Sequence, residues 1–369
     1  MVAIVLVLLG DVLSSAYQQA QLDMGIFSPE TLSVGDLFVG ALIPGLMLVG
    51  LYLIYIAFIA YTKPNAMPAM EISDEENNAP VLQAVFKSLL PPLFLIIAVL
   101  GSIIGGLATP TEAAGVGAVG SLMLAGLRFN EGRGQAIIIG GVGLVIMLIL
   151  ANVFDLRMSR NEIPTTDLIA IIAAFGCVGL LLWGLGTSLK RVLETTMDGS
   201  RDPILYEVMR TTMEISAMVF VILIGAGVFS LVFRGLGGDD LVHEILANLP
   251  GGKWGAILVV MVVMFFLGFI LDFIEITFVV VPIVAPVLLR MDIDPVWLGI
   301  MMAMNLQTSF LTPPFGFALF YLRGVAPPSV TTGDIYRGVM PFVAIQIIGL
   351  LLLAMFPALA TWLPKVVFN

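Results

Sequence analysis

Long apolar stretches separated by short polar segments recur along the whole chain. Most are about 20 residues long, the length that a helix needs to cross a ~30 Å hydrocarbon core. The pattern predicts helices at Asp36–Tyr61, Leu89–Leu107, Glu112–Leu127, Ala136–Val153, Leu168–Leu185 and Ile215–Phe233. A longer apolar run, Trp254–Leu289, is followed by an interrupted stretch at Met301–Tyr321 and by a last helix at Val339–Trp362. We therefore predict an all-α polytopic membrane protein.

The composition strengthens this prediction and excludes several classes of function. Of 369 residues, 59% are hydrophobic and 11% are charged, and the mean hydropathy is +1.08, whereas soluble domains carry about 25% charged residues. The formal net charge of −10 argues against a nucleic-acid partner. The single histidine, His243, excludes a multi-histidine metal centre. The single cysteine, Cys177, excludes an intrachain disulfide bond.

The apolar run Trp254–Leu289 is too long for one ordinary membrane span. Asp272 and Glu275 interrupt it, and Pro282 and Pro286 follow, so we predict a helix that is broken within the membrane. Non-helical backbone at membrane depth is tolerated only where it is buried in protein or lines a polar cavity. Such a break is the best indication that a sequence offers of a transporter binding site.

A second break is predicted in the polar stretch Leu306–Gly316. Pro313 and Pro314 remove two backbone donors and block helical continuation, and Gly316 permits close backbone approach. Side-chain oxygens gather beside this break, on Asn305, Gln307, Thr308, Ser309 and Thr312. These side chains either satisfy backbone groups that the break frees or bind a ligand. We favour a ligand site because so many polar groups accompany the lost helical bonds.

Asp272 is the sharpest candidate for an ion-binding residue. No basic residue lies within a dozen positions of it, and an acid within the membrane indicates a functional site by default. A proton or a hard cation such as Na⁺ would neutralise it, with carbonyl and hydroxyl oxygens from the broken helix as further ligands. Glu275 either faces a polar cavity or is protonated and packed against its neighbours.

The segment Thr109-Pro110-Thr111-Glu112 is typical of a helix start. Thr109 suits the N-cap, Pro110 suits the first helical position, and Glu112 closes a capping box. Direct ligand binding is the alternative, because an uncompensated carboxylate at bilayer depth is costly. We favour the structural interpretation for this motif.

An internal repeat links the two ends of the chain. Ser33–Gly40 matches Thr331–Gly338 at an offset of 298 residues, with serine or threonine three positions before aspartate in both copies, a pattern typical of helix starts. The apolar segment Val2–Gly10 likewise resembles Phe315–Gly324. A proline break precedes the second of these arms, so the equivalent first break would fall ahead of residue 1. We therefore expect a chain truncated at its N-terminus, with the first repeat incomplete.

These features together resemble the large membrane subunit of tripartite ATP-independent periplasmic (TRAP) transporters. The likeness depends on the motif Gly105–Ala114, on the break Leu311–Gly316 and on Asp272 in its apolar helix. Two further motifs, Arg234–Asp239 and Asn305–Phe310, resemble the branch associated with mannitol and chloroaromatic compounds.

The resemblance implies an ion-transporter-type fold with two inverted repeats, each with a re-entrant hairpin, and an elevator motion driven by a Na⁺ gradient. It implies Asp272, Thr308, Ser309 and Thr312 as ion ligands. It implies Asn305, Gln307, Pro313, Pro314, Gly316 and Glu275 at the solute site and hairpin. A periplasmic binding protein would deliver a small, anionic organic solute, and a small membrane subunit would complete the complex in the bacterial inner membrane. No cofactor is expected apart from Na⁺ as the coupling ion.

On this basis the chain divides into four parts. Residues 1–62 are the remainder of the first repeat, with its hairpin arm and long helix, and residues 63–88 are a cytoplasmic loop. Residues 89–203 hold scaffold helices that include an inserted pair, Ala136–Val153 and Leu168–Leu185, and residues 204–369 form the second repeat. The side of the loop follows from the distribution of basic residues. Lys63, Lys87, Arg128, Arg133, Lys190, Arg191 and Arg201 share one side if the helices alternate, and Arg157 and Arg160 lie on the other.

Other functions remain open at this stage. A transporter of the same superfamily that works without a binding protein is one alternative, and an inactive fragment or a structural membrane subunit is another. A membrane-embedded hydrolase would need a nucleophile–base pair or two facing acids, and the motifs above supply neither, so an enzyme is not expected.

Overall fold

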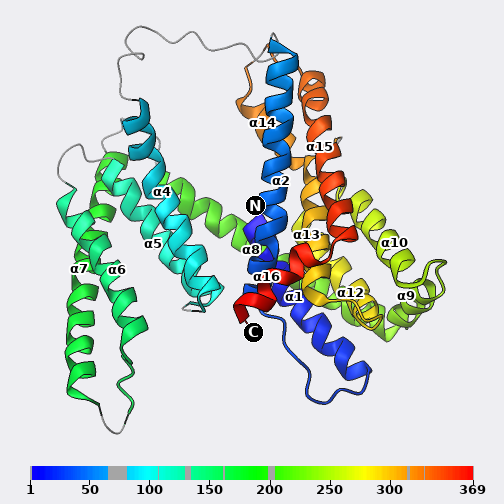
Figure 1. Ribbon diagram of the computed structural model, residues 1–369, viewed down its shortest axis with the longest axis horizontal. Helices are drawn as coiled ribbons and strands as arrows, with labels where there is room; N and C mark the ends of the chain where they lie inside the picture. Colours follow the sequence, from blue (N-terminus) through cyan, green and yellow to red (C-terminus); the bar gives the residue numbers. More distant parts are fainter. Residues whose placement is uncertain are drawn as a thin grey trace. The chain divides into compact units, whose positions relative to one another are not determined.

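A computed structural model describes residues 2–64, 81–106, 108–128, 134–160, 163–197, 204–313, 316–327 and 329–368. Every regular element in these ranges is a helix, and none is a strand (Figure 1). The elements are α1 (Val2–Asp23), α2 (Val34–Thr62), α4 (Val81–Ile104), α5 (Pro110–Arg128), α6 (Gln135–Val153), α7 (Thr165–Met197), α8 (Ile204–Gly235), α9 (Gly238–Ala247), α10 (Gly252–Leu267), α11 (Phe273–Glu275), a π-helical turn (Ile276–Val280), α12 (Val281–Leu289), α13 (Pro295–Leu311), α14 (Phe317–Val325), α15 (Thr332–Met355) and α16 (Ala358–Phe368).

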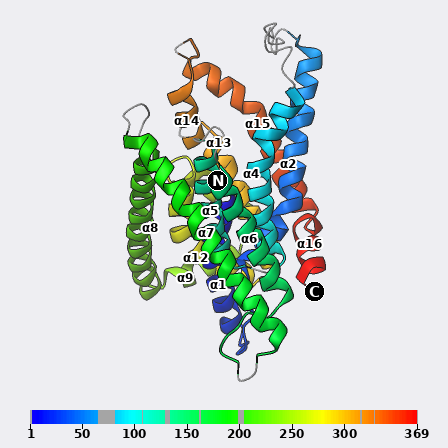
Figure 2. The ribbon, with the colours of Figure 1, turned by 90° about the vertical axis from the view of Figure 1, so that its left-hand side faces the viewer.

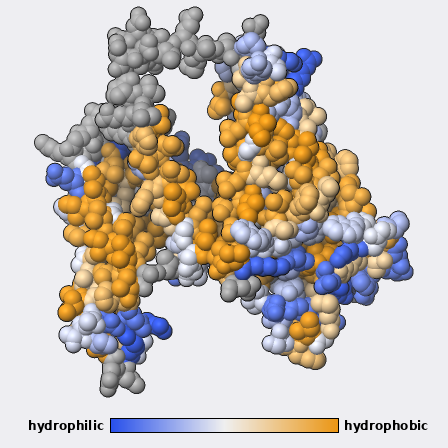
Figure 3. Space-filling view, in the orientation of Figure 1, coloured by the Kyte–Doolittle hydropathy of each residue, from blue (hydrophilic) through white to orange (hydrophobic). Residues whose placement is uncertain are grey.

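Four of these helices are long and apolar enough to cross a membrane, namely Val34–Thr62, Thr165–Glu194, Leu205–Gly235 and Thr332–Met355. Their outer faces are largely apolar, and hydrophobic residues dominate the surface in Figure 3. The protein is therefore an all-α polytopic membrane protein, as predicted. Most of the predicted loop, residues 63–88, lies outside the described residues. Its end is wrong, because α4 begins at Val81, where the sequence turns apolar ahead of the predicted helix start at Leu89.

The chain divides into two compact units, one of residues 1–70 and 216–369 and the other of residues 71–215. In the second unit, α6 and α7 run side by side (Figure 2). Small residues allow this close contact. A Cβ atom added to Gly140 would lie 3.0 Å from the Cα atom of Gly184, and one on Gly143 would lie 3.1 Å from the Cys177 carbonyl oxygen. Glycines therefore bring the two backbones together.

The contact between α6 and α7 yields a stability prediction. Gly140→Val should lower the free energy of unfolding by about 1–3 kcal/mol, because the new side chain has no room between the backbones. Thermal unfolding of the detergent-solubilised chain measures the loss. Gly176→Ala on α7 is the matched control, since a Cβ atom there meets nothing within 4 Å. Equal unfolding temperatures for both variants would contradict the proposed packing.

Helix α1 packs against α12 and α13 in the core of the first unit and is longer than the predicted arm Val2–Gly10. The helix continues to Asp23 because buried apolar residues recur at helical spacing past Gly10, as at Leu9, Leu13 and Ala16. A polar clamp then secures the following loop. The Gln21 side chain donates to the Glu30 carbonyl at 3.1 Å and accepts from the Glu30 N–H at 2.8 Å.

The two copies of the internal repeat both begin long helices. Ser33 with Asp36 and Thr331 with Asp334 form complete capping boxes at the starts of α2 and α15, which confirms the predicted helix starts. The two helices run antiparallel. Leu48 of α2 lies beside Gly349 of α15, whereas Tyr52 and Tyr55 further along α2 pack on Phe342, earlier in α15.

The predicted last helix, Val339–Trp362, is wrong in its extent, because the structure has two helices here. α15 ends at Met355 and α16 begins at Ala358. Pro357 lacks an N–H group and disfavours helical geometry at the residue before it. Phe356 accordingly adopts φ −125° and ψ 74°.

Candidate functional site

Two interruptions of helical structure meet within the first unit. α10 ends at Leu267, and the chain becomes helical again only at Phe273, so the predicted break in Trp254–Leu289 is present. A Cβ atom on Gly268 would lie 2.2 Å from the hydroxyl oxygen of Ser309. The chain therefore needs glycine at this point, where the first break packs directly on the end of α13.

Asp272 caps the helix that restarts after the first break. Its Oδ1 accepts a hydrogen bond from the Phe273 N–H at 2.7 Å, and Glu275 Oε2 accepts from the Asp272 N–H at 3.3 Å. The pair thus forms a capping box, a pattern that was predicted at Thr109–Glu112 but not at Asp272. The cap does not use every carboxylate oxygen of Asp272, so the group keeps acceptor capacity for a cation.

Irregular helix follows the cap. The π-helical turn Ile276–Val280 separates α11 from α12, and such turns are frequent at functional sites. Within it, the buried Thr277 hydroxyl donates to the Phe273 carbonyl at 2.7 Å. Thr277 was not among the residues predicted from the sequence, although a polar residue in an apolar run so close to Asp272 could have indicated it.

The hydroxyl side chains near the end of α13 bond to their own helix. Thr308 donates to the Met304 carbonyl at 2.8 Å, Ser309 to Leu306 at 2.9 Å and Thr312 to Thr308 at 2.7 Å. These bonds match the alternative in which side chains satisfy local backbone groups. Each hydroxyl oxygen nevertheless retains lone pairs as an acceptor.

Asn305 links the two broken elements. Its amide nitrogen donates to the Met261 carbonyl of α10 at 2.8 Å, and the side chain is buried. The bond therefore joins α13 to α10 at Met261, about two turns before the first break at Gly268. The structure thus gives Asn305 an interhelical contact, and its predicted place at the solute site stays a prediction.

The second break turns the chain from α13 into α14. Thr312 leaves the helix with φ −90° and ψ 127°. A Cβ atom on Gly316 would lie 2.9 Å from the Phe310 carbonyl oxygen, so glycine permits the chain to fold back over the end of α13. Pro313 is half-buried in this turn, whereas Pro314 lies outside the described residues.

A cavity of about 330 Å³ lies beside both breaks. Its lining residues come from α1, α11, α13 and α14, namely Val5, Phe273, Ala303, Leu306, Gln307, Phe310, Leu311 and Ala318. The lining is mostly apolar, and Gln307 supplies its side-chain amide. Asp272 directly precedes one lining residue, Phe273. A small organic molecule of mixed polarity could occupy this space.

The motif at Thr109 is a helix start, as the favoured interpretation predicted. The Thr109 N–H donates to Glu112 Oε2 at 2.8 Å, and the Glu112 N–H donates to the Thr109 hydroxyl at 3.3 Å. Pro110 opens α5, and Thr111 is exposed. The motif belongs to the unit of residues 71–215, whereas the two breaks belong to the other unit.

Among the described residues, no group of three or more His, Cys, Asp or Glu side chains could hold a metal ion. A cation near Asp272 would therefore need carbonyl or hydroxyl oxygens in addition to the carboxylates of Asp272 and Glu275. The two breaks offer both kinds of oxygen, because the chain leaves helical bonding at Gly268–Asp272 and again after Leu311.

Comparison with known proteins agrees with this architecture. Residues 23–359 match the family model described as "Tripartite ATP-independent periplasmic transporter, DctM component". A C4-dicarboxylate TRAP transporter large permease from Vibrio cholerae is 25% identical over 75% of this chain and 50% of its own length. A protein of the same description from Pseudomonas aeruginosa is 25% identical over 90% of this chain and 60% of its own length.

A third relative is named for a different solute. The ectoine TRAP transporter large permease of Halomonas elongata is 23% identical over 75% of this chain and 65% of its own length. The chain thus spans roughly half to two thirds of the length of these curated relatives.

Proposed function

Because this chain belongs to the DctM component family of tripartite ATP-independent periplasmic transporters, we propose that it acts as the permease subunit of a Na⁺-coupled uptake system. The family is one of transporters and not of enzymes. The observation that carries the proposal is the meeting of two helix breaks beside Asp272 and a cavity of about 330 Å³.

The proposed solute is a small organic anion. Several relatives are named for C4-dicarboxylates, sialic acid and isethionate, which are acids, whereas another is named for ectoine. A Na⁺ ion at Asp272 would offset the negative charge of such a solute in the adjacent cavity, and Gln307 would donate an amide N–H to it. The apolar remainder of the lining would contact the carbon skeleton.

Ion binding and solute binding would be coupled because a bound ion stabilises one conformation of the two helix breaks. Na⁺ bound by Asp272 and by carbonyl oxygens would order the turn after α13, because Gly268 at the first break contacts Ser309 near the second. Solute would then bind to the ordered form with higher affinity, so ion and solute cross together. We propose an elevator motion of the broken elements in the bacterial inner membrane, with a small membrane subunit and a periplasmic binding protein as partners. The assignment to the mannitol and chloroaromatic branch stays a prediction.

An uptake assay tests this proposal. The complete transporter, reconstituted in proteoliposomes with its small subunit and binding protein, should accumulate labelled succinate, sialic acid or isethionate only under an inward Na⁺ gradient. Replacement of Na⁺ by K⁺ should abolish accumulation. Uptake that is indifferent to the cation would overturn Na⁺ coupling, and full uptake without the binding protein would overturn the tripartite assignment.

Asp272→Asn isolates the charge of the proposed ion ligand. Asparagine caps a helix as well as aspartate does, so α11 should still begin normally. We expect the Na⁺ concentration for half-maximal uptake to rise about tenfold or more, which corresponds to the loss of one charge-assisted contact.

A matched control exists in the same unit. Asp294 caps α13 through hydrogen bonds from Val296 and Trp297, and its side chain is exposed. Asp294→Asn should leave the Na⁺ dependence unchanged. Identical Na⁺ dependence in both variants would remove Asp272 from the ion site.

A further inference from the structure

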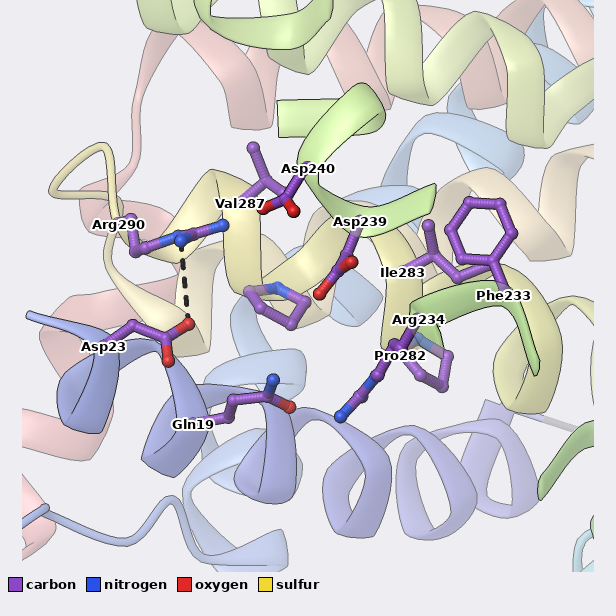
Figure 4. Close-up of a pocket in the computed structure, with 11 residues that line it drawn as sticks. Gln19, Asp23, Phe233, Arg234, Asp239, Asp240, Pro282, Ile283, Val287 and Arg290 are labelled. Carbon is purple, nitrogen blue, oxygen red and sulfur yellow. Dashed lines mark ion pairs between the residues drawn. The ribbon is translucent and has the colours of Figure 1, made fainter. Parts of the chain in front are cut away.

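A second cavity, of about 210 Å³, lies where several helices of the first unit end (Figure 4). Its charged and polar lining residues are Gln19 and Asp23 of α1, Arg234 of α8, Asp239 and Asp240 of α9, and Arg290, which follows α12. Figure 4 shows Asp239, Asp240 and Arg290 around Val287. This cavity shares no lining residue with the one at the breaks.

The cavity lies at the end of a membrane-spanning helix. The apolar span Leu205–Gly235 of α8 ends there, and α9 continues with hydrophilic residues on one side. In Figure 3, hydrophilic residues of this unit gather around α9 and the C-terminal end of α1, next to surfaces that are otherwise hydrophobic. This arrangement is typical of the zone where lipid headgroups meet water.

The two arginines that line this cavity do not use all of their hydrogen-bond donors within the described residues. Arg290 Nη1 lies 3.6 Å from Asp23 Oδ2, a long contact for an ion pair. Its Nε atom is buried and has no hydrogen-bond partner within the described residues. In that part of the chain, Arg234 also forms no ion pair. Buried donors are nearly always satisfied in folded proteins, so the Nε of Arg290 indicates a partner that approaches from the cavity.

The carboxylates of Asp239 and Asp240 add negative charge to the lining of the cavity, beside the positive charge of the two arginines. Neither makes an ion pair within the described residues. The helix dipole alone accounts for acids in the first turn of α9 and for arginines at the ends of α8 and α12. The dipole does not explain why one cavity is lined by both arginines and aspartates. It also does not explain why the Nε atom of Arg290 lacks a partner within the described residues.

We propose that this cavity binds the phosphoethanolamine group, a zwitterion. Its phosphate would accept hydrogen bonds from Arg290 and Arg234, and its ammonium would donate to Asp239 and Asp240. An anion alone would meet the repulsion of the two aspartates, and a cation alone would meet that of the arginines. The volume corresponds to about seven water molecules at ~30 Å³ each, enough for a phosphate and an ammonium joined by two carbons.

Two binding experiments on the purified full chain distinguish the sources of this group. Calorimetry with soluble O-phosphoethanolamine tests the free molecule. Native mass spectrometry from nanodiscs that contain phosphatidylethanolamine, phosphatidylcholine or phosphatidylglycerol tests the lipid. Retention of phosphatidylethanolamine alone would identify a lipid site, and binding of the soluble molecule alone would identify a solute site.

Selectivity decides whether the zwitterion is recognised. Trimethylation removes the N–H donors that the aspartates need, so phosphocholine compounds should bind about tenfold more weakly. Phosphatidylglycerol should bind more weakly still, since it lacks the positive charge. Binding of phosphatidylglycerol as tight as that of phosphatidylethanolamine would overturn the proposal, and so would binding of neither zwitterionic form.

Variants locate the site. Arg234→Gln and Asp239→Asn should each weaken binding about tenfold or more. Arg210→Gln is the matched control on the same helix, because Arg210 pairs with Glu214 near the other end of α8, and it should bind normally. Circular dichroism of each variant verifies that the fold is intact. Equal affinity of all three variants would place the ligand elsewhere and end the assignment.

Discussion

Asn305→Asp is expected to lower the free energy of unfolding by about 3–5 kcal/mol at neutral pH, the cost of an uncompensated buried charge. The asparagine amide donates to the Met261 carbonyl at 2.8 Å in a buried contact. A carboxylate has no hydrogen to donate, so two oxygens would face each other without solvent. Because this bond joins α13 to α10, we also expect solute uptake to be lost.

The penalty for Asn305→Asp should depend on pH in a defined direction. In acid, a protonated carboxyl can donate its O–H to the same carbonyl, so the variant should regain stability as the pH falls and lose it as the pH rises. Thermal unfolding across the pH range measures this effect.

A control separates burial from the chemical change. Asn248 makes the same type of bond, to the Glu244 carbonyl at 2.8 Å, at an exposed position, and Asn248→Asp should cost at most about 1 kcal/mol. A similar loss for both variants would contradict the buried link.

Gly268→Val should abolish uptake, with a reduction of at least about 100-fold, because the two breaks could no longer touch. The first carbon of any side chain at this position would lie 2.2 Å from the Ser309 hydroxyl and 2.4 Å from its Cβ atom. Rotation about χ1 could move the Ser309 hydroxyl but not its Cβ atom, so the backbone would have to shift. Displacements of this kind at a binding site are costly for activity.

A pair of substitutions tests the contact itself. Gly268→Ala should destabilise the protein by about 1–3 kcal/mol, and Ser309→Gly in the same chain should restore most of that loss by removing the obstructing side chain. Unfolding temperature is the readout, because uptake would also register the missing hydroxyl. A double variant no more stable than Gly268→Ala would refute the contact. Gly225→Ala, at a position with nothing within 4 Å, controls for the added methyl group.

Local chemistry allowed much of the fold to be predicted from the sequence. Proline and acidic residues in apolar runs marked both breaks, because each disturbs helical bonding within a few positions. The capping boxes at Ser33, Thr109 and Thr331 are equally local. The spacing of apolar residues in α1 also indicates locally how far this helix extends. The prediction of a short arm at Val2–Gly10 did not use that spacing.

The site depends on contacts that no local pattern contains. Asn305 and Met261 are 44 positions apart, and Gly268 meets Ser309 across a similar distance in the chain. The sequence predicted one ligand site from the polar side chains of Asn305, Thr308, Ser309 and Thr312, because they are close together in the chain. The structure separates them, because one makes an interhelical bond and three bond within their own helix.

The antiparallel course of α2 and α15 restricts how this protein can change in evolution. α15 begins beside the end of α2, so the chain between them must return to the membrane face from which it departed. That requires an even number of complete crossings. A hairpin such as α6–α7 can accordingly be gained or lost without disturbing the two long helices. A solitary additional crossing would invert everything that follows it.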